Sequence, residues 1–137
     1  MAALTTDRET TRKEDSIKSF PVAATTQIYK GSLVMLNSAG YLVPGADASG
    51  AKFTGVAYEK VLGGAAAGDK WCKVYRKGIF DFAASGLSQA NVGDAMYLSD
   101  DQTFALVGAM TNDIMCGVLI EYISATRGWL DIGARIS

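Results

Sequence analysis

The sequence predicts a small all-β domain, an antiparallel barrel or sandwich, and three observations support this prediction. Short apolar runs are separated by Gly, Asn, Ser and Asp, and turn residues recur about every 8 to 12 positions. Alternation with a period of two residues is clear in several runs, whereas helical periodicity is weak throughout. The chain also contains 15 glycines, as expected of a fold with many tight turns.

Composition indicates one domain and argues against two classes of partner. The chain has 137 residues, 49% hydrophobic and 20% charged, which is enough apolar sequence for a single core. Its 13 basic and 14 acidic residues give a net charge of −1, and nucleic-acid-binding domains normally carry a positive excess. No apolar run has the length of a membrane span or of a signal peptide. We therefore expect no nucleic-acid partner and no membrane partner.

The residue types present leave few routes to catalysis. There is no histidine, which excludes Ser–His and Cys–His nucleophilic sites and histidine metal sites. Cys72 and Cys116 are too few for a four-thiolate zinc site, and we expect both to be buried thiols. We expect no metal, no cofactor and no catalytic residues. The remaining enzymatic alternative is a small hydrolase that uses Asp100 or Asp101, although "SDDQT" is also typical turn chemistry.

Residues 1–19 differ from the rest of the chain and predict an extended N-terminal arm. This segment is rich in threonine and carries four charges of each sign, so that it cannot bury enough apolar area to fold alone. One interpretation is a solvated terminus. The other is an arm that becomes ordered on a partner, with basic residues pairing with carboxylates, aliphatic residues filling shallow pockets and an aromatic residue anchoring the arm. The residues expected to act in this way are Leu4, Arg8, Arg12, Lys13, Ile17 and Phe20.

Residues 20–137 form the β-rich domain, whose strands can be placed in order. "GSLVML", "NSAG" and "YLVP" predict a hairpin over residues 31–44, and "FTGVAYE" predicts a strand over 53–59. A long strand follows over 71–82, with one or two helical turns at most in 85–94. "MYLSDDQTFALV" predicts a second hairpin over 96–107. The last pair of strands is 114–123 and 128–136, joined by "SATR".

Alternation assigns one face of these strands to the core. In 114–123 the apolar parity contains Ile114, Cys116, Val118, Ile120 and Tyr122, and in 128–136 it contains Leu130, Ile132, Ala134 and Ile136. We expect the inward residues to pack together, and truncation of Phe80 to cost roughly 3–5 kcal/mol. The expected core is Val74, Phe80, Phe82, Cys116, Val118, Leu130 and Ile132.

The strand over 71–82 carries a basic and aromatic outer face. Lys70, Lys73, Arg76 and Lys77 resemble a polyanion site, but no helix follows to complete a phosphate-binding loop. We interpret them as the solvent or interface side of a strand that is interrupted by a bulge near Lys77–Gly78. Large outward aromatic residues are typical of surfaces that a partner buries, unless the protein's own loops cover them. The predicted self-association residues are Trp71, Tyr75 and Trp129.

The order of motifs resembles that of the tailed-bacteriophage capsid decoration (cement) proteins. The similarity lies in "KGSLVMLNSAGYLVP", "FTGVAYEKVLGGAAAGDKWCKVYRKGIFDF", "ANVGDAMYLSDDQTFALV", "CGVLIEYIS" and "GWLDIGARI", which span about Phe20 to Ile136. The resemblance implies a small β-barrel or β-tulip-like trimer without catalysis. It implies a protein made in the bacterial host cytoplasm that binds the major capsid protein on the outside of the virion and stabilises the shell. The non-structural alternative is a carbohydrate-binding appendage of the head or tail, with Trp71, Tyr75 or Trp129 as stacking platforms.

Overall fold

A computed structural model describes residues 16–134 and confirms an all-β antiparallel fold. The N-terminal sheet has five strands in the order β1 (Ile17–Pro21), β7 (Trp71–Tyr75), β5 (Lys52–Ala57), β3 (Leu33–Leu36) and β4 (Leu42–Pro44). The C-terminal sheet has the order β10 (Phe104–Ala105), β9 (Ala95–Leu98), β11 (Met115–Ser124), β12 (Arg127–Asp131) and β8 (Ile79–Ala83). A ribbon of β2 (Gln27–Ile28) and β6 (Val61–Leu62) completes the first half, and η1 (Gln89–Asn91) and η2 (Ile132–Ala134) are single 3₁₀ turns.

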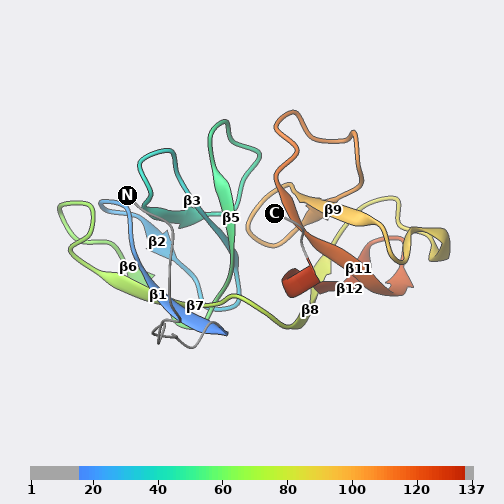
Figure 1. Cartoon of the computed structure of the whole chain (residues 1–137), viewed down its shortest axis with the longest axis horizontal. Helices are drawn as coiled ribbons and strands as arrows, with labels where there is room; N and C mark the ends of the chain where they lie inside the picture. The colour runs from blue at the N-terminus through green and yellow to red at the C-terminus, as the bar shows by residue number, and fades with distance from the viewer. Residues whose placement is uncertain (1–15, 135–137) are drawn as a thin grey trace, which may run out of the picture.

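The two sheets are built from consecutive halves of the chain and lie side by side (Figure 1). Each sheet curves until its edge strands meet. In the N-terminal sheet Val22 bridges Leu42, whose carbonyl oxygen accepts the N–H of Ala23 at 3.0 Å. In the C-terminal sheet Ala83 bridges Thr103, and the Ala83 N–H donates to Gln102 O at 3.1 Å. The C-terminal sheet is therefore a half-barrel whose first and last strands, β10 and β8, come close together.

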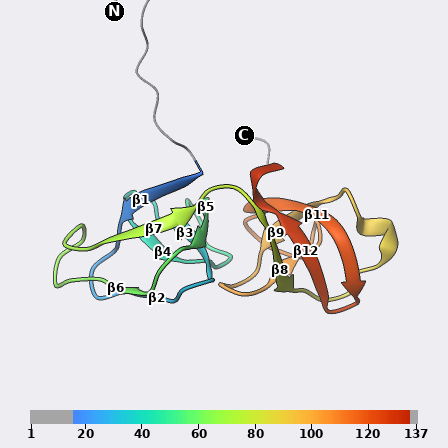
Figure 2. The same ribbon diagram turned by 90° about the horizontal axis from the view of Figure 1, so that it is seen from below.

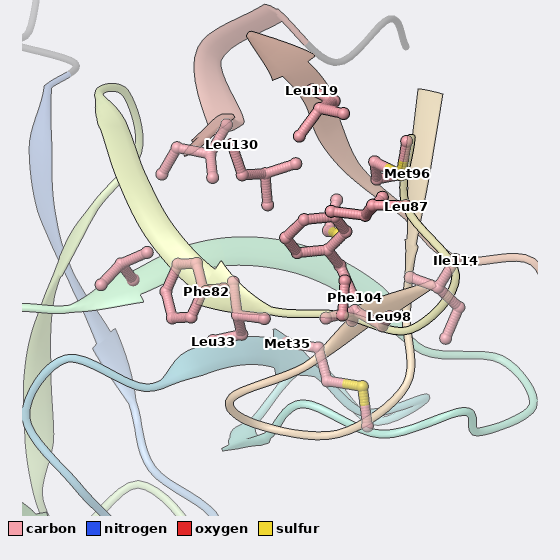
Figure 3. Close-up of a cluster of buried hydrophobic side chains, with 14 residues drawn as sticks. Leu33, Met35, Phe82, Leu87, Met96, Leu98, Phe104, Ile114, Leu119 and Leu130 are labelled. Atoms are coloured by element: carbon pink, nitrogen blue, oxygen red, sulfur yellow. The ribbon is translucent and has the colours of Figure 1, made fainter. Parts of the chain in front are cut away.

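The central strands of the N-terminal sheet, β3 and β5, are buried on both faces. Their side chains Leu33, Met35 and Val56 join the large core of the C-terminal half-barrel, and Figure 3 shows Leu33 and Met35 among the side chains of that cluster. Alternate residues of the same sheet, including Val34 and Val74, face a smaller core. The unbroken apolar run "LVML" follows from this position, because a strand between two cores has no solvent face to mark by polar residues.

Local turn chemistry explains the predicted hairpins, which are confirmed. β3 and β4 are joined by a turn in which the side chain of Asn37 accepts the N–H groups of Ala39 and Tyr41, each at 3.0 Å, and Gly40 has φ of 90°. β9 and β10 are joined by a turn in which Asp100 Oδ1 accepts the Gln102 N–H at 2.9 Å. β11 and β12 form the last hairpin.

The predicted long strand over 71–82 is two strands, and its interruption lies where a bulge was expected. β7 ends at Tyr75 and β8 begins at Ile79 in the other sheet, so the chain crosses between sheets at 76–78 (Figure 2). Gly78 has φ of 131°, and a Cβ there would lie 2.9 Å from the Phe80 ring. Val74 is consequently in the smaller core, and not with Phe82 in the large core as predicted.

The predicted inward face of 114–123 is wrong at Val118 and Ile120, whereas Tyr122, beyond a second register shift, packs against the large core as predicted. Met115 pairs with Tyr97 but Gly117 pairs with Met96, so β11 gains one residue at this point relative to β9. The extra residue reverses the parity. Leu119 is fully buried in place of Val118, which is half-buried, and Ile120 is 42% exposed.

The end of the chain also differs from its prediction. The last strand ends at Asp131, and Ile132 is buried from the 3₁₀ turn η2 that follows. The side chain of Ala134, and Ile136 with the rest of 135–137, lie outside the described residues. Of the predicted core, Phe82, Cys116, Leu130 and Ile132 are buried in the large cluster, and Phe80 is half-buried against it.

Candidate interaction surface: the aromatic groove

A groove lies where the two sheets meet. It has a volume of about 310 Å³ and is walled by β5, by the end of β7 and by β8 with its neighbour β12. It is lined by Lys30, Gly31, Val56, Ala57, Tyr58, Tyr75, Ile79, Phe80, Asp81, Phe82 and Trp129. A second hollow of about 330 Å³ shares Gly31, Asp81 and Phe82 with it and continues to Gln102 and Arg127. We call the first hollow the aromatic groove.

Three aromatic rings form a chain along one wall. The ring centroids of Tyr58 and Tyr75 lie 5.1 Å apart, and those of Tyr75 and Phe80 lie 5.6 Å apart. Both pairs are tilted, at 56° and 45°, in the range of favourable aromatic contacts. The contacts fix the rings, so that the groove has a rigid apolar wall that bridges the two sheets.

Glycine at position 55 makes this wall possible. A Cβ on Gly55 would lie 1.9 Å from the carbonyl oxygen of Tyr75, and its φ of 156° is unfavourable for any other residue. β5 can therefore approach β7 closely enough for Val56 to pair with Tyr75. This pairing places Tyr75 on the face of the N-terminal sheet that looks toward the C-terminal sheet.

The charges around the groove are unevenly paired. Asp81, on the outer face of β8, forms an ion pair and hydrogen bonds with Arg127. The Glu59 carboxylate accepts the backbone N–H of Lys73 at 2.9 Å. The lysine side chains lie over rings instead, with Lys73 Nζ 6.0 Å from the Tyr58 centroid and Lys60 Nζ 5.5 Å from that of Tyr29.

The structure brings two of the three predicted self-association residues together. Tyr75 and Trp129 both line the aromatic groove, each half-buried. Trp71 lies at the other end of β7, opposite Pro21, and is 56% exposed. Large exposed apolar side chains flank the groove as well: Ile79 is 52% exposed and Tyr58 is 40% exposed.

The described part of the predicted arm is a strand. Ile17, Lys18 and Ser19, which we assigned to the arm, pair with β7 as part of β1, with Ile17 directly opposite Tyr75. Phe20 is half-buried against the smaller core, as an anchor would be, and Lys18 Nζ lies 4.6 Å from its ring centroid. Leu4, Arg8, Arg12 and Lys13 lie outside the described residues.

The candidate acidic and thiol residues have structural partners. Asp100 caps its own turn, Asp101 O accepts the Leu33 N–H at 2.8 Å, and Asp94 accepts the Asn91 side chain at 3.2 Å. Cys72 and Cys116 are both buried free thiols, in different cores. Burial and, secondarily, the charge of Glu59 raise the pKa of Cys72 to about 11. Among residues 16–134, no three His, Cys, Asp or Glu side chains are grouped so that they could hold a metal ion.

The sequence did not reveal the other residues of the groove. Tyr58 and Lys30 were assigned no role, and Phe80 was expected in the core. The only local signal for Tyr58 is its large aromatic side chain near the end of "FTGVAYE". The groove itself is assembled from strands far apart in sequence, so local signals do not reveal it. The basic residues of 70–77 were predicted on the solvent or interface side, and Lys70, Lys73 and Lys77 are exposed.

Within the described range no helix is long and apolar enough to cross a membrane. Comparison of the sequence with known families and curated proteins, and of the structure with solved structures, gives no match.

Proposed function

We propose that this chain is a structural protein that binds the outer surface of a tailed-phage capsid and stabilises the shell. The observation that carries the proposal is the apolar and aromatic surface around the groove, where Tyr58 is 40% and Ile79 is 52% exposed. An exposed patch of this kind on a small domain is typical of a protein–protein contact. The order of sequence motifs supports the choice of the capsid as partner.

The proposed mechanism is mass action. A subunit that binds the assembled shell but not its separated capsomers stabilises the shell by its binding free energy. Many copies on a symmetric lattice add weak contacts by avidity. The chain is made in the host cytoplasm, associates as a trimer and attaches to the major capsid protein, with the N-terminal arm contributing Arg8, Arg12 and Lys13 and the groove surface facing a neighbour.

The test is reconstitution on particles that lack the protein. Purified full-length protein is added to such particles, and bound protein and particle integrity under heat or chelator are measured. The proposal predicts saturable binding and a higher temperature of DNA release. Particles that neither bind the protein nor gain stability would overturn it.

A second candidate function is carbohydrate binding. The observation in its favour is that Tyr75 and Trp129, two of the predicted stacking residues, line one groove beside the carboxylate of Asp81. Glycan-array binding without any affinity for particles would favour this alternative. The carboxylate of Asp100 caps its own turn, and the backbone carbonyl oxygen of Asp101 accepts the Leu33 N–H. No observation favours a hydrolase.

A further inference from the structure

Within residues 16–134, part of the β8 edge that faces the aromatic groove has backbone groups without a hydrogen-bond partner. β8 pairs with β12 on one side, whereas on the other side only Ala83 is bridged, by Thr103. The Ile132 N–H donates to Gly78 O at 3.0 Å at one end of the β12 ladder. At the other end the Ala84 N–H donates to Thr126 O at 2.9 Å. In an antiparallel ladder only every second residue directs its N–H and C=O groups toward the partner strand. Ile79 and Asp81 lie between those residues, so their N–H and C=O groups point away from β12.

Among the described residues, the outward N–H and C=O groups of β8 have a hydrogen-bond partner at the Ala83 end of the strand and none at the Ile79 end. The Ala83 N–H, the next in the outward series, donates to Gln102 O at 3.1 Å, where the half-barrel closes. Ile79 and Asp81 line the aromatic groove, and the wall across from them is made by Gly31 and by Val56–Tyr58. An exposed edge of this kind is a template for a further strand, unless the protein covers it.

Another edge strand of the described residues, β1, is protected in a way that β8 is not. β1 is also an edge strand, but it ends in Pro21, which has no N–H, and Lys18 Nζ donates to the outward carbonyl of Ser19 at 3.3 Å. In β8 the corresponding positions carry Ile79, which is 52% exposed, and Asp81. β8 therefore lacks the protection that β1 has.

The charge around the groove defines the complementary ligand. In the described part of the chain, Lys30, Lys60 and Lys73 are all exposed and none of them forms an ion pair. Of the acidic groups nearby, Asp81 is engaged with Arg127 and Glu59 with the Lys73 N–H, and Asp101 lines the adjacent hollow with Lys30. Lys30 lines the aromatic groove and Lys73 lies over the Tyr58 ring at its edge, so the rim offers two cations without an ion pair.

We propose that the aromatic groove is a peptide-binding site in which an acidic, extended segment of another protein adds a strand to the open edge of β8. The segment pairs antiparallel, like every strand pair of the two five-stranded sheets, and receives hydrogen bonds from Ile79 and Asp81. Alternate side chains of the segment, those on the Phe80 face of the sheet, contact Tyr75 and Phe80, which favours a β-branched or aromatic residue there. Carboxylates that flank it face Lys30 and Lys73. This site goes beyond the proposed function, because it does not depend on which assembly supplies the segment.

The experiment is selection from a random seven-residue peptide library on the immobilised full-length protein, followed by NMR titration with the synthetic winner. The expected winners alternate apolar β-branched or aromatic residues with Asp or Glu. Binding should protect the Ile79 and Asp81 amides from hydrogen exchange, which should be fast in the free protein. A version of the peptide with Lys in place of its acidic residues should bind about tenfold more weakly.

Matched variants separate strand addition from simple apolar contact. Ile79→Pro removes one outward donor at the first residue of the strand without breaking the β12 ladder, and should weaken binding about fivefold. Ile79→Val, which keeps the donor and most of the side chain, should bind more tightly than Ile79→Pro. A second route, independent of the backbone, is Lys30→Glu, which should weaken binding, whereas Lys52→Glu on another part of the surface should not.

Three outcomes would overturn the inference. The first is a selection in which no peptide is enriched. The second is that the selected peptides bind the Ile79→Pro and Lys30→Glu proteins as tightly as the parent. The third is that the Ile79 and Asp81 amides are already protected from hydrogen exchange in the free protein. The last outcome would mean that the protein's own residues cover the edge. Failure to bind capsids, by contrast, would not affect this result.

Discussion

Tyr75 and Phe80 belong to different sheets, yet their ring centroids lie 5.6 Å apart at an interplanar angle of 45°. Only the short crossing at 76–78 separates them in sequence. The contact couples the end of the N-terminal sheet to the start of the C-terminal sheet, and it forms one wall of the aromatic groove.

The first prediction concerns this contact. Phe80→Ala should lower the free energy of unfolding by about 2 kcal/mol, less than our sequence-based expectation, because the ring is only half-buried. Phe104→Ala should cost more, roughly 3–5 kcal/mol, since Phe104 is 1% exposed in the large core. Chemical denaturation measures both. Equal losses for the two variants would contradict the packing described here.

The close approach of β5 and β7 gives a second prediction. Gly55→Ala should destabilise the protein by more than about 3 kcal/mol, because its Cβ would overlap the Tyr75 carbonyl oxygen and its φ is unfavourable. Gly86→Ala is the control: φ is 71° there, but no atom lies within 4 Å of the added Cβ. It should cost about 1 kcal/mol. Thermal unfolding of the two variants should differ clearly, and a tolerated Gly55→Ala would mean that the two strands are farther apart.

A third prediction concerns the loop before β11 and its dependence on pH. Asp47 accepts the N–H groups of Thr111 and Asn112 at 2.9 and 2.8 Å, and these hydrogen bonds lower the pKa of Asp47 below its ordinary value of 3.8. A carboxyl with a depressed pKa stabilises the fold above its unfolded pKa, and this contribution is lost as the pH falls through the folded pKa. Hydrogen exchange at Thr111 and Asn112, corrected for intrinsic rates, should therefore accelerate below about pH 4.

Asp47→Ala provides the control for this effect. In the variant the two amides should exchange rapidly at every pH, and the acid-dependent change should disappear. Persistence of the same acid transition at Thr111 in Asp47→Ala would assign it to another group.

The fourth prediction concerns the two thiols. Both are buried, and the pKa of Cys72 is raised to about 11, so little thiolate exists at pH 8. Neither cysteine should react with a thiol reagent in the native protein within the time in which both react in denaturant. Reaction of one equivalent under native conditions would show that one core opens to solvent without global unfolding.

The fifth prediction follows from the proposed trimer. Trp71 is 56% exposed on β7, and its replacement in Trp71→Ser should shift the protein from trimer to monomer in sedimentation. Val107→Ser, at a loop position that is 72% exposed, should leave the trimer intact. A parent chain that is monomeric both free and on the particle would remove self-association from the proposed function.

The sequence predicted the hairpins because their signals are local. Asn37 and Gly40 shape one turn and Asp100 shapes another, and each acts on residues within four positions of itself. The pairing of β1 with β7 could not be predicted from local signals, because it joins Ile17 to Tyr75 across the whole first half of the chain. The two-sheet arrangement depends on such pairings.

Other errors have a common physical cause. Val118 and Leu119 are both apolar, so alternation cannot tell which one faces the core after the bulge at Cys116 and Gly117. Likewise, Tyr75 and Trp129 could be identified as unusual outward aromatics, but the groove that unites them comes from tertiary packing. No spacing in the sequence links Trp129 to Tyr58.

The placement of the N-terminal sheet between two cores has a consequence for biosynthesis. All of its strands lie within residues 17–75, so they are synthesised before any strand of the C-terminal half. Until that half is synthesised and folds, its core does not cover Leu33, Met35 and Val56, so the nascent chain exposes an apolar surface for several seconds. Translation speed and chaperone supply, more than final stability, should then set the yield of soluble protein, and a fragment that stops near residue 78 should aggregate.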